Sequence, residues 1–336
     1  MKNLSSRRRF IGILAAATGS LLVPGALRGA LAHSPPAPPL TSWRGIALGA
    51  DAELHIYHPD AEIARRLIDQ SVAEVHRLEK IFSLYQDGSV LSILNRQGFL
   101  DTPPADLLNL LSTSRHFSMV TGGAFDPSVQ PLWTLYADHF SQAHADPGGP
   151  SRAAIERVLA LVDHESIEIG ADRIRLLRPG MALTLNGIAQ GYITDRVTQL
   201  LRKAGLDRAL VDMGEIQAMD RHEHALPWRV GLADPEHPEQ VFETVSIRNH
   251  ALATSGGYGT HLDAAGRFAH IFDPGTGSSQ ARYRSVSVLA SNATTADALS
   301  TGLSNMPLPD AESLIRTMGV KAWFILADGS RVVLEG

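Results

Sequence analysis

The amino-acid sequence predicts an α+β fold. Patterns typical of strands and of helices follow one another irregularly, without the regular strand–helix–strand alternation of a doubly wound sheet. The 336 residues are 44% hydrophobic and 19% charged, an ordinary globular composition that suits one large domain or two modest ones. The sequence has no internal repeat, and past residue 42 it has no stretch typical of a linker.

The N-terminal residues have the features of an export signal. Arg7-Arg8-Arg9 precede an apolar stretch, and Ala30-Leu31-Ala32 fits an A-x-A cleavage pattern. The arginines followed by Phe10-Ile11-Gly12 resemble a twin-arginine signal. We therefore predict a signal peptide over residues 1–32, cleaved near Ala32, with the twin-arginine translocase as a partner and the periplasm as the destination. An uncleaved N-terminal anchor is the alternative.

Charge and composition argue against several classes of function. Residues 1–32 contain five basic residues and no acid, so their removal takes the formal net charge from −5 to −10. A chain this acidic, without a basic run, is not expected to bind nucleic acid or an anionic membrane surface. Glycine and proline interrupt the apolar stretch within residues 1–32, which is too weak for a membrane span, and we expect no membrane insertion of the mature chain. The absence of cysteine excludes disulfides, thiolate metal sites and thiol nucleophiles.

The first half of the chain predicts a hairpin and two helices. Residues 33–42 form a Pro-rich leader that should be extended. Apolar and polar residues alternate over residues 43–57, which predicts two short strands, and an apolar stripe predicts a helix over residues 59–81. A further helix should begin at Thr102 as its cap, with proline in the first turn, and stop at Gly122-Gly123.

The second half predicts more strands than helices. We expect two short strands around a turn at Ala171-Asp172, a helix over residues 188–204, a buried strand over residues 209–213, and mostly strands from 228 to 290. Two helices should follow, one in the stretch "ATTADALST" and one near residues 309–318. A final hairpin should turn at Asp328-Gly329.

Asp297 and Thr301 lie four residues apart on the predicted helix in "ATTADALST". Residues at this spacing sit above one another, so a carboxylate and a hydroxyl would point in the same direction, which suits a hard cation. The pair fits equally well as two ordinary polar residues of a first turn.

Three glycine-rich segments offer further sites, over residues 121–133, 183–197 and 251–277. The turn at Asn186-Gly187 leads into a helix whose first N–H groups suit a phosphate and whose turn carbonyls can face a cation. It is neither a Walker loop nor a G-x-G-x-x-G, and an ordinary strand-to-helix turn is the alternative. His270 precedes a turn on an apolar strand, where a histidine is more often a packed residue. No G-x-S-x-G appears, so a serine triad has no support.

Seven segments in order resemble the ApbE family, the FAD:protein FMN transferases. They are "FSLYQDGSVLSILN", "TGGAFDPSVQPL", "NGIAQGYITDRV", "LVDMGEIQA", "ALATSGGY", "HIFDPGTG" and "VSVLASNATTADALSTGL". The resemblance covers residues 43–336. It implies a T-fold-like α+β domain with mixed antiparallel sheets and packed helices. It also implies an exported enzyme that uses Mg²⁺ and FAD, transfers FMN to a Thr or Ser hydroxyl of an acceptor flavoprotein, and releases AMP.

The resemblance also assigns site residues. It implies a metal site at Asp297, Thr301 and the carbonyl of Gly187, with His270 and Asp297 as the catalytic residues. His270 would position or deprotonate the acceptor hydroxyl. The implied FAD-binding residues are Leu48, Tyr85, Ala124, Phe125, Asp126, Thr184, Gln190 and His270.

The chain departs from the usual family pattern at several positions. Thr184 replaces an acid, Gln190 a Lys or Glu, and Gly257 another acid, while Gly214-Glu215-Ile216 is one glycine short. These departures fit a specialised branch, such as the twin-arginine-exported flavin transferases that serve nitrous-oxide respiration, or weakened catalysis. Two other functions stay open: a hydrolase that splits FAD into FMN and AMP, and a flavin-binding carrier or assembly factor without transfer activity.

Overall fold

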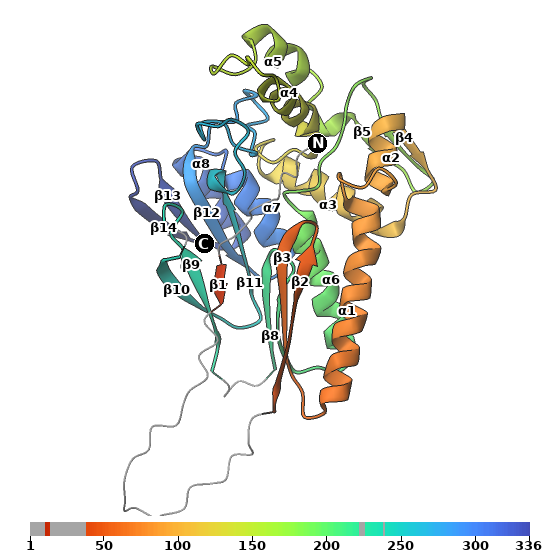
Figure 1. Ribbon diagram of the computed structural model, residues 1–336, viewed down its shortest axis with the longest axis vertical. Coiled ribbons are helices and arrows are strands. Elements are labelled where there is room, and N and C mark those ends of the chain that lie inside the picture. Colours follow the sequence, from red (N-terminus) through yellow and green to blue (C-terminus); the bar gives the residue numbers. More distant parts are fainter. Residues whose placement is uncertain (1–10, 14–37, 222–225, 238) are drawn as a thin grey trace, which may run out of the picture.

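A large antiparallel sheet organises the molecule (Figure 1). The computed structural model describes residues 11–13, 38–221, 226–237 and 239–336. Within them, eight strands pair in the order β14-β13-β12-β11-β8-β7-β3-β2, each antiparallel to its neighbours. These strands are β2 (Leu40–Ala47), β3 (Ala50–Tyr57), β7 (Arg208–Asp212), β8 (Ile216–Asp220), β11 (Ala251–Gly256), β12 (Tyr283–Ala290), β13 (Lys321–Leu326) and β14 (Arg331–Glu335).

Helices cover one face of this sheet. Leu54, Val211 and Val288 point into a core shared with α1, α3, α6, α7 and α8, and every one of the three is fully buried. Figure 1 shows α1 and α6 running side by side along β2 and β3. The helices are α1 (Ala61–Phe82), α3 (Ala105–Val120), α6 (Ala189–Lys203), α7 (Ala293–Leu303) and α8 (Leu308–Met318).

A smaller sheet covers the opposite face. Its strands pair in the order β1-β9-β10, and they are β1 (Ile11–Ile13), β9 (Trp228–Ala233) and β10 (Val241–Ile247). Val230 and Ile247 of this sheet pack against Leu210 and Leu252 of the large one. The two faces of the large sheet therefore carry two separate cores, an arrangement that confirms the predicted α+β class with mixed antiparallel sheets and packed helices.

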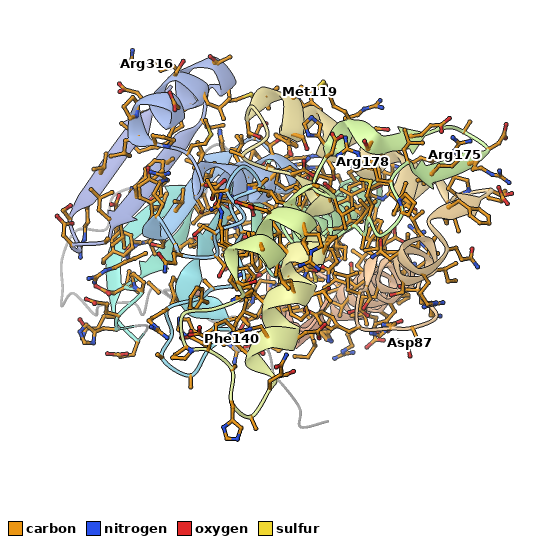
Figure 2. All side chains as sticks on the ribbon, turned by 90° about the horizontal axis from the view of Figure 1, so that it is seen from above. Asp87, Met119, Phe140, Arg175, Arg178 and Arg316 are labelled. Carbon is orange, nitrogen blue, oxygen red and sulfur yellow. The ribbon has the colours of Figure 1, made fainter. Side chains whose placement is uncertain are left out.

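Two peripheral units flank this sandwich. The first is a three-stranded sheet in the order β4-β6-β5, with α2 beside it; the elements are α2 (Val90–Gln97), β4 (Phe99–Asp101), β5 (Ile167–Ile169) and β6 (Arg173–Leu176). The second is the pair α4 (Gln130–Phe140) and α5 (Arg152–Leu159). Seen from above, Arg175 of β6 and Arg316 of α8 lie toward opposite ends of the molecule (Figure 2).

The helix predictions are confirmed where a cap or a glycine stop marks them. Asn292 caps α7 by accepting from the N–H of Thr295, and Gly122 and Gly123 adopt positive φ directly after α3. One predicted cap is wrong: Thr102 lies outside the helix with φ 51°, and α3 begins only after Pro104. The final hairpin turns as predicted, with Gly329 at φ 85°.

The expected run of strands over residues 228–290 is wrong between 257 and 282. This stretch contains a short 3-10 helix (Gly257–Gly259) and one isolated bridge, His261 to Ala269. Phe268 and Phe272 do not join a strand ladder, because their rings pack against Tyr136 of α4, with centroids 5.8 Å and 5.2 Å apart. Aromatic packing on α4, and not strand pairing, therefore holds these two residues in place.

The predicted signal peptide and Pro-rich leader lie largely outside the described residues. Of residues 1–42, the structure describes 11–13, which pair with β9, and 38–42, where β2 already begins at Leu40. No helix in the described ranges is both long and apolar enough to cross a membrane.

Candidate functional site

The first turn of α6 packs directly against α7. The N–H of Gly191 donates to Oδ2 of Asp297 at 2.9 Å. A Cβ on Gly191 would lie 2.3 Å from the carbonyl oxygen of Ala293, so only glycine allows this approach. Asp297 itself is only 2% exposed. The contact therefore holds a buried carboxylate at a fixed position between two helices.

Asp195, one turn further along α6, caps the N-terminal end of α7. Its carboxylate accepts from the N–H groups of Ala293 and Thr294 at 2.9 Å each, and from the Thr294 hydroxyl at 2.5 Å. Burial raises the pKa of Asp195, while these hydrogen bonds oppose the shift. Together with Asn292 they satisfy the first N–H groups of α7, which fixes the direction in which the helix presents Asp297.

Two of the three residues expected to hold a metal ion, Gly187 and Thr301, lie in contact, and the third, Asp297, is on the same helix as Thr301. Asp297 and Thr301 lie one turn apart on α7, and Gly187 lies in the turn that precedes α6. A Cβ on Gly187 would come within 2.8 Å of Thr301 Oγ1, so the turn backbone lies against this hydroxyl. A carboxylate, a hydroxyl and a backbone carbonyl are all oxygen donors, a set that fits Mg²⁺.

This arrangement differs from a metal site built on several acidic or histidine side chains. Across the described ranges, no group of three or more His, Cys, Asp or Glu residues could hold a metal ion. A site at Gly187, Asp297 and Thr301 contains one carboxylate only. Mg²⁺ keeps several waters or substrate phosphates as ligands, so a small protein contribution of this kind is consistent with its coordination chemistry.

The N-terminus of α6 is less open to a phosphate than the sequence predicts. The N–H of Ala189 donates to the carbonyl of Leu185 at 2.8 Å, and that of Gly191 is taken by Asp297. The N–H of Tyr192 donates to the carbonyl of Ile188. The first turn thus uses most of its N–H groups inside the protein, so few of them remain to bind a pyrophosphate.

Asp126 has a structural role in the segment expected to line the nucleotide. One oxygen accepts from the N–H and hydroxyl of Ser128 at 2.8 Å and 2.6 Å, and the other accepts from the N–H and Nδ1 of His164 at 3.1 Å each. The hydrogen bond to Asp126 raises the pKa of His164 above its ordinary value. The carboxylate therefore fixes the turn that presents Ala124 and Phe125.

His270 lies in a loop one residue past the isolated bridge, and not on a strand as expected. Its Nδ1 is 3.3 Å from the carbonyl oxygen of Thr260. A proton on Nδ1 shared with that carbonyl places the basic lone pair on Nε2, the nitrogen that would then accept a proton from a hydroxyl.

Thr184 and Gln190 occupy different surroundings. The Thr184 hydroxyl accepts from the N–H of Asn186 at 3.2 Å, and its own N–H donates to the Pro127 carbonyl at 2.7 Å. Gln190 is buried on α6, and its side chain packs against Gly214. A Cβ added to Gly214 would lie 2.2 Å from Nε2 of Gln190. Thr184 thus joins two of the glycine-rich segments, whereas Gln190 packs against a tight backbone turn.

Leu48 and Tyr85 lie near the C-terminal end of α1. Leu48 is in the turn between β2 and β3, and its N–H donates to Glu79 of the last turn of α1 at 2.7 Å. Tyr85 follows α1 in a loop and its side chain is 71% exposed. An exposed ring of this kind is available to stack on an aromatic ligand.

Residues 48–324 match the ApbE family. The chain belongs to the ApbE family. The FAD:protein FMN transferase of Treponema pallidum is 30% identical over 307 residues, which cover 84% of this chain and 83% of that protein. The protein of the same name from Escherichia coli strain K12 is 27% identical, over 86% of this chain and 82% of that protein. Both relatives carry the same name and match most of the chain, which shows that the chain is a transferase.

Solved structures of the ApbE family share the fold. The crystal structure of the ApbE protein from Thermotoga maritima has a TM-score of 0.77 and 27% identity, covering 88% of this chain and 97% of that one. The flavin transferase ApbE from Vibrio cholerae, at 23% identity, has a TM-score of 0.74 and supports the fold alone. The expected ApbE-like architecture is confirmed.

Packing explains one departure from the usual ApbE pattern. Gly257 stands where family members usually carry an acid. A Cβ there would lie 2.9 Å from the Cβ of Ala281 and 3.3 Å from that of Ala269, because the loop over residues 269–281 packs against the 3-10 helix. A carboxylate side chain does not fit at residue 257 unless this loop moves.

Two residues of this ApbE site were missed in the sequence. Ser255 Oγ lies 2.8 Å from Ser300 Oγ and 3.3 Å from Thr301 Oγ1. Asn305 Nδ2 donates to the carbonyls of Ala124 at 3.0 Å and Phe272 at 2.9 Å. Ser255 belongs to "ATSGGY" and could have been found there, whereas Asn305 follows the last motif and carries no sequence signal.

Proposed function

We propose that this protein transfers FMN from FAD to a Thr or Ser hydroxyl of an acceptor flavoprotein, releases AMP and requires Mg²⁺. The observation that carries the proposal is the packing of the turn at Gly187 against Thr301, one helical turn from Asp297, whose carboxylate is held by the Gly191 N–H. The relatives named FAD:protein FMN transferase support the same reaction.

The residues of the chain have separate roles in this reaction. Asp297 supplies the negative charge of the metal site and is oriented by the Gly191 N–H. Thr301 is held between Gly187 and Ser255. When bound, Mg²⁺ supplies positive charge that neutralises the pyrophosphate as the bond to AMP breaks. His270 accepts the proton of the acceptor hydroxyl as the new phosphoester bond to FMN forms.

The residues to which we assign FAD binding lie on separate elements. Asn305 joins the loop that carries Ala124 to the loop that carries His270, so one side chain sets the spacing of two candidate ligand-binding segments. Tyr85 offers an exposed ring for the flavin. We assign the recognition of FAD to these segments together with Leu48 and Gln190.

The cellular setting is part of the proposal. The arginines at 7–9 and the small residues that end at Ala32 support export by the twin-arginine translocase, cleavage near Ala32 and a periplasmic site of action. The acceptor would then be a flavoprotein that faces the periplasm. The departures at Thr184, Gln190 and Gly257 support membership of a specialised branch, for which we propose the flavin transferases of nitrous-oxide respiration.

Intact-mass measurement tests this function. The mature chain is incubated with FAD, Mg²⁺ and each periplasm-facing flavoprotein encoded beside it, and one acceptor should gain the mass of FMN while AMP appears. Asp297→Ala should abolish both signals. Rapid AMP release without an acceptor would instead indicate the hydrolase. Tight FAD binding without AMP release would indicate the carrier.

A further inference from the structure

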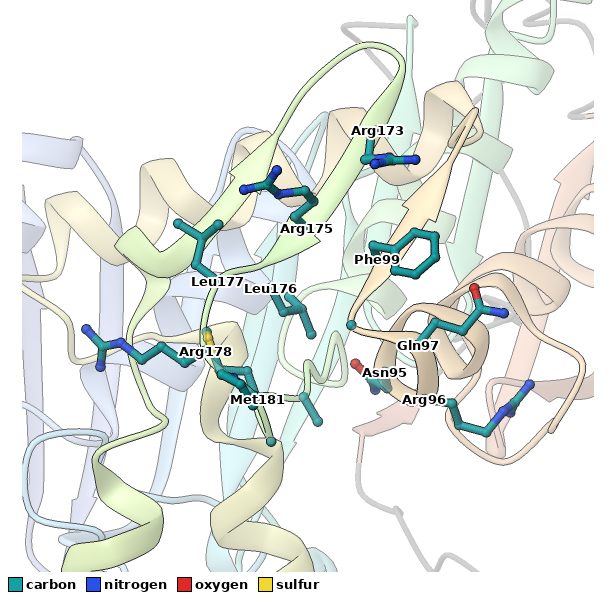
Figure 3. A pocket seen from close by; sticks show the side chains of 14 residues that line it. Asn95, Arg96, Gln97, Phe99, Arg173, Arg175, Leu176, Leu177, Arg178 and Met181 are labelled. Carbon is teal, nitrogen blue, oxygen red and sulfur yellow. The ribbon is translucent and has the colours of Figure 1, made fainter.

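A groove of about 650 Å³ lies between α2 and the segment that follows β6 (Figure 3). It is formed by the C-terminal end of α2, the start of β4, and the chain from β6 to Ala182. Four arginines and no acidic residue line it. Figure 3 shows Arg96 and Arg178 on opposite sides of this groove, with Leu176 between them.

The acidic partners of these arginines lie outside the groove lining. Arg175 Nε is 2.9 Å from Glu168, Arg173 pairs with Asp101, and Arg178 pairs with Asp163. Each of these three arginine side chains is about half exposed. Exposed ion pairs are weak, so a carboxylate on a partner can replace or share them at low cost.

Arg96 is held by a backbone oxygen and not by an acid. Its Nη1 donates to the carbonyl of Asp87 at 2.8 Å, and no ion pair of Arg96 occurs among the described residues. Three of the four lining arginines are paired with acids beside the groove, and Arg96 is the lining guanidinium without an acidic partner among the described residues. One guanidinium without an acidic partner, beside three half-exposed arginines in weak ion pairs, favours an acidic partner at this position.

The groove also exposes apolar surface. Phe99 is 41% exposed and Leu177 is 49% exposed. The guanidinium of Arg173 lies 5.3 Å from the centroid of the Phe99 ring. Arginines interleaved with exposed aromatic and aliphatic side chains are typical of surfaces that bind polypeptides.

Rigid contacts connect this groove to the candidate active site. Asn95 donates to the carbonyl of Leu183 at 2.8 Å and accepts from its N–H at 2.7 Å. The chain continues from Leu183 through Thr184 to Gly187 of the metal site. On the other side, Arg96 contacts Asp87 in the loop that carries Tyr85. A polypeptide in the groove would thus lie beside two segments assigned to FAD and metal binding.

We propose that this groove docks an acidic, partly apolar segment of the acceptor polypeptide. The inference rests on the proposed function, because a protein substrate needs a binding surface beyond the one that holds FAD. Carboxylates of the segment would pair with Arg96 and Arg175, and its apolar side chains would cover Phe99 and Leu177.

Fluorescence anisotropy tests the proposal without any transfer reaction. The probe is a short fluorescein-labelled peptide that mixes glutamate, leucine and serine, and the matched probe carries glutamine in place of every glutamate. The full chain should prefer the acidic probe, and added salt should weaken its binding. The double variant Arg96→Gln/Arg175→Gln should bind the acidic probe about tenfold more weakly.

Arg316→Gln is the control variant, because Arg316 is an exposed, ion-paired arginine on α8 at the other end of the molecule. It should bind the acidic probe as the wild type does, and it and the single variant Arg175→Gln should keep the wild-type affinity for FAD. Equal binding of both probes would overturn the proposal, as would an equal loss in Arg316→Gln. Loss of FAD binding in Arg175→Gln would assign the groove to the nucleotide instead. Since these measurements need no FMN transfer, their failure is distinct from a failure of the proposed function.

Discussion

The backbone N–H of Gly191 donates to the carboxylate of Asp297 at 2.9 Å, across a sequence separation of 106 residues. This hydrogen bond joins α6 to α7, where Gly191 also lies close to the Ala293 backbone. It makes the position of the carboxylate depend on a glycine in a different helix, so the site can be perturbed without changing any proposed ligand.

Gly191→Ala should destabilise the protein. The added Cβ would lie 2.3 Å from the Ala293 carbonyl oxygen and 2.8 Å from the Cβ of Asp297. Overpacking of this kind lowers the free energy of unfolding by about 1–3 kcal/mol. Urea denaturation measures the change. Gly88→Ala is the control, since nothing lies within 4 Å of a Cβ there, and it should shift the value by less than about 0.5 kcal/mol. Equal stability of the two variants would contradict the close helix contact.

Asn305→Asp should weaken FAD binding and lower stability. The substitution keeps the shape of the side chain but replaces the donor that reaches the carbonyls of Ala124 and Phe272. Leaving buried acceptors unsatisfied costs about 1–3 kcal/mol. Thermal unfolding and equilibrium FAD titration check both effects. Gln142→Glu makes the same amide-to-acid change at an exposed position and should leave both measurements unchanged. If Asn305→Asp bound FAD as tightly as the wild type, the proposed role of Asn305 would be contradicted.

The His164–Asp126 pair should make stability depend on pH. Because Asp126 raises the pKa of His164 in the folded state, the pair contributes stability that is fully present below the unfolded pKa of histidine. That contribution is lost as the pH rises through the folded pKa. The free energy of unfolding should therefore fall between about pH 6 and pH 9 by more in the wild type than in His164→Gln. Parallel pH profiles of the two proteins would show that the pair is not coupled to folding.

Ser255→Ala should weaken divalent metal binding without unfolding the protein. Ser255 lies 3.3 Å from Thr301 Oγ1 and 2.8 Å from Ser300 Oγ, so its hydroxyl orients a proposed ligand. Loss of such a supporting contact typically costs about tenfold in metal affinity. Mn²⁺ titration followed by electron paramagnetic resonance gives the affinity directly, and Ser255→Thr should restore it. Ser141→Ala, at an exposed position after α4, is the matched control.

Local signals in the sequence were sufficient for the elements that frame the site. The apolar stripe of α1 and the glycine stop at Gly122-Gly123 each act within one or two turns of chain. The spacing of Asp297 and Thr301 also predicted a shared direction, and both residues lie on α7. These features depend on local helix geometry, which short stretches of the sequence are enough to predict.

Features that depend on distant contacts could not be predicted. The strand expected around His270 is absent, because Phe268 and Phe272 pack on Tyr136, more than 130 residues away. The first N–H groups of the helix after Gly187 were expected to suit a phosphate, and the one at Gly191 instead bonds to Asp297. A sequence read locally shows which groups are available, but tertiary packing decides which of them are used.

Titration of Mg²⁺ in the presence of FAD tests the central claim most directly. Isothermal calorimetry on the wild type and on the isosteric variant Asp297→Asn should show metal binding that is at least about tenfold weaker in the variant, with the fold retained. Unchanged Mg²⁺ affinity in Asp297→Asn would place the metal elsewhere and contradict the site at Gly187, Asp297 and Thr301.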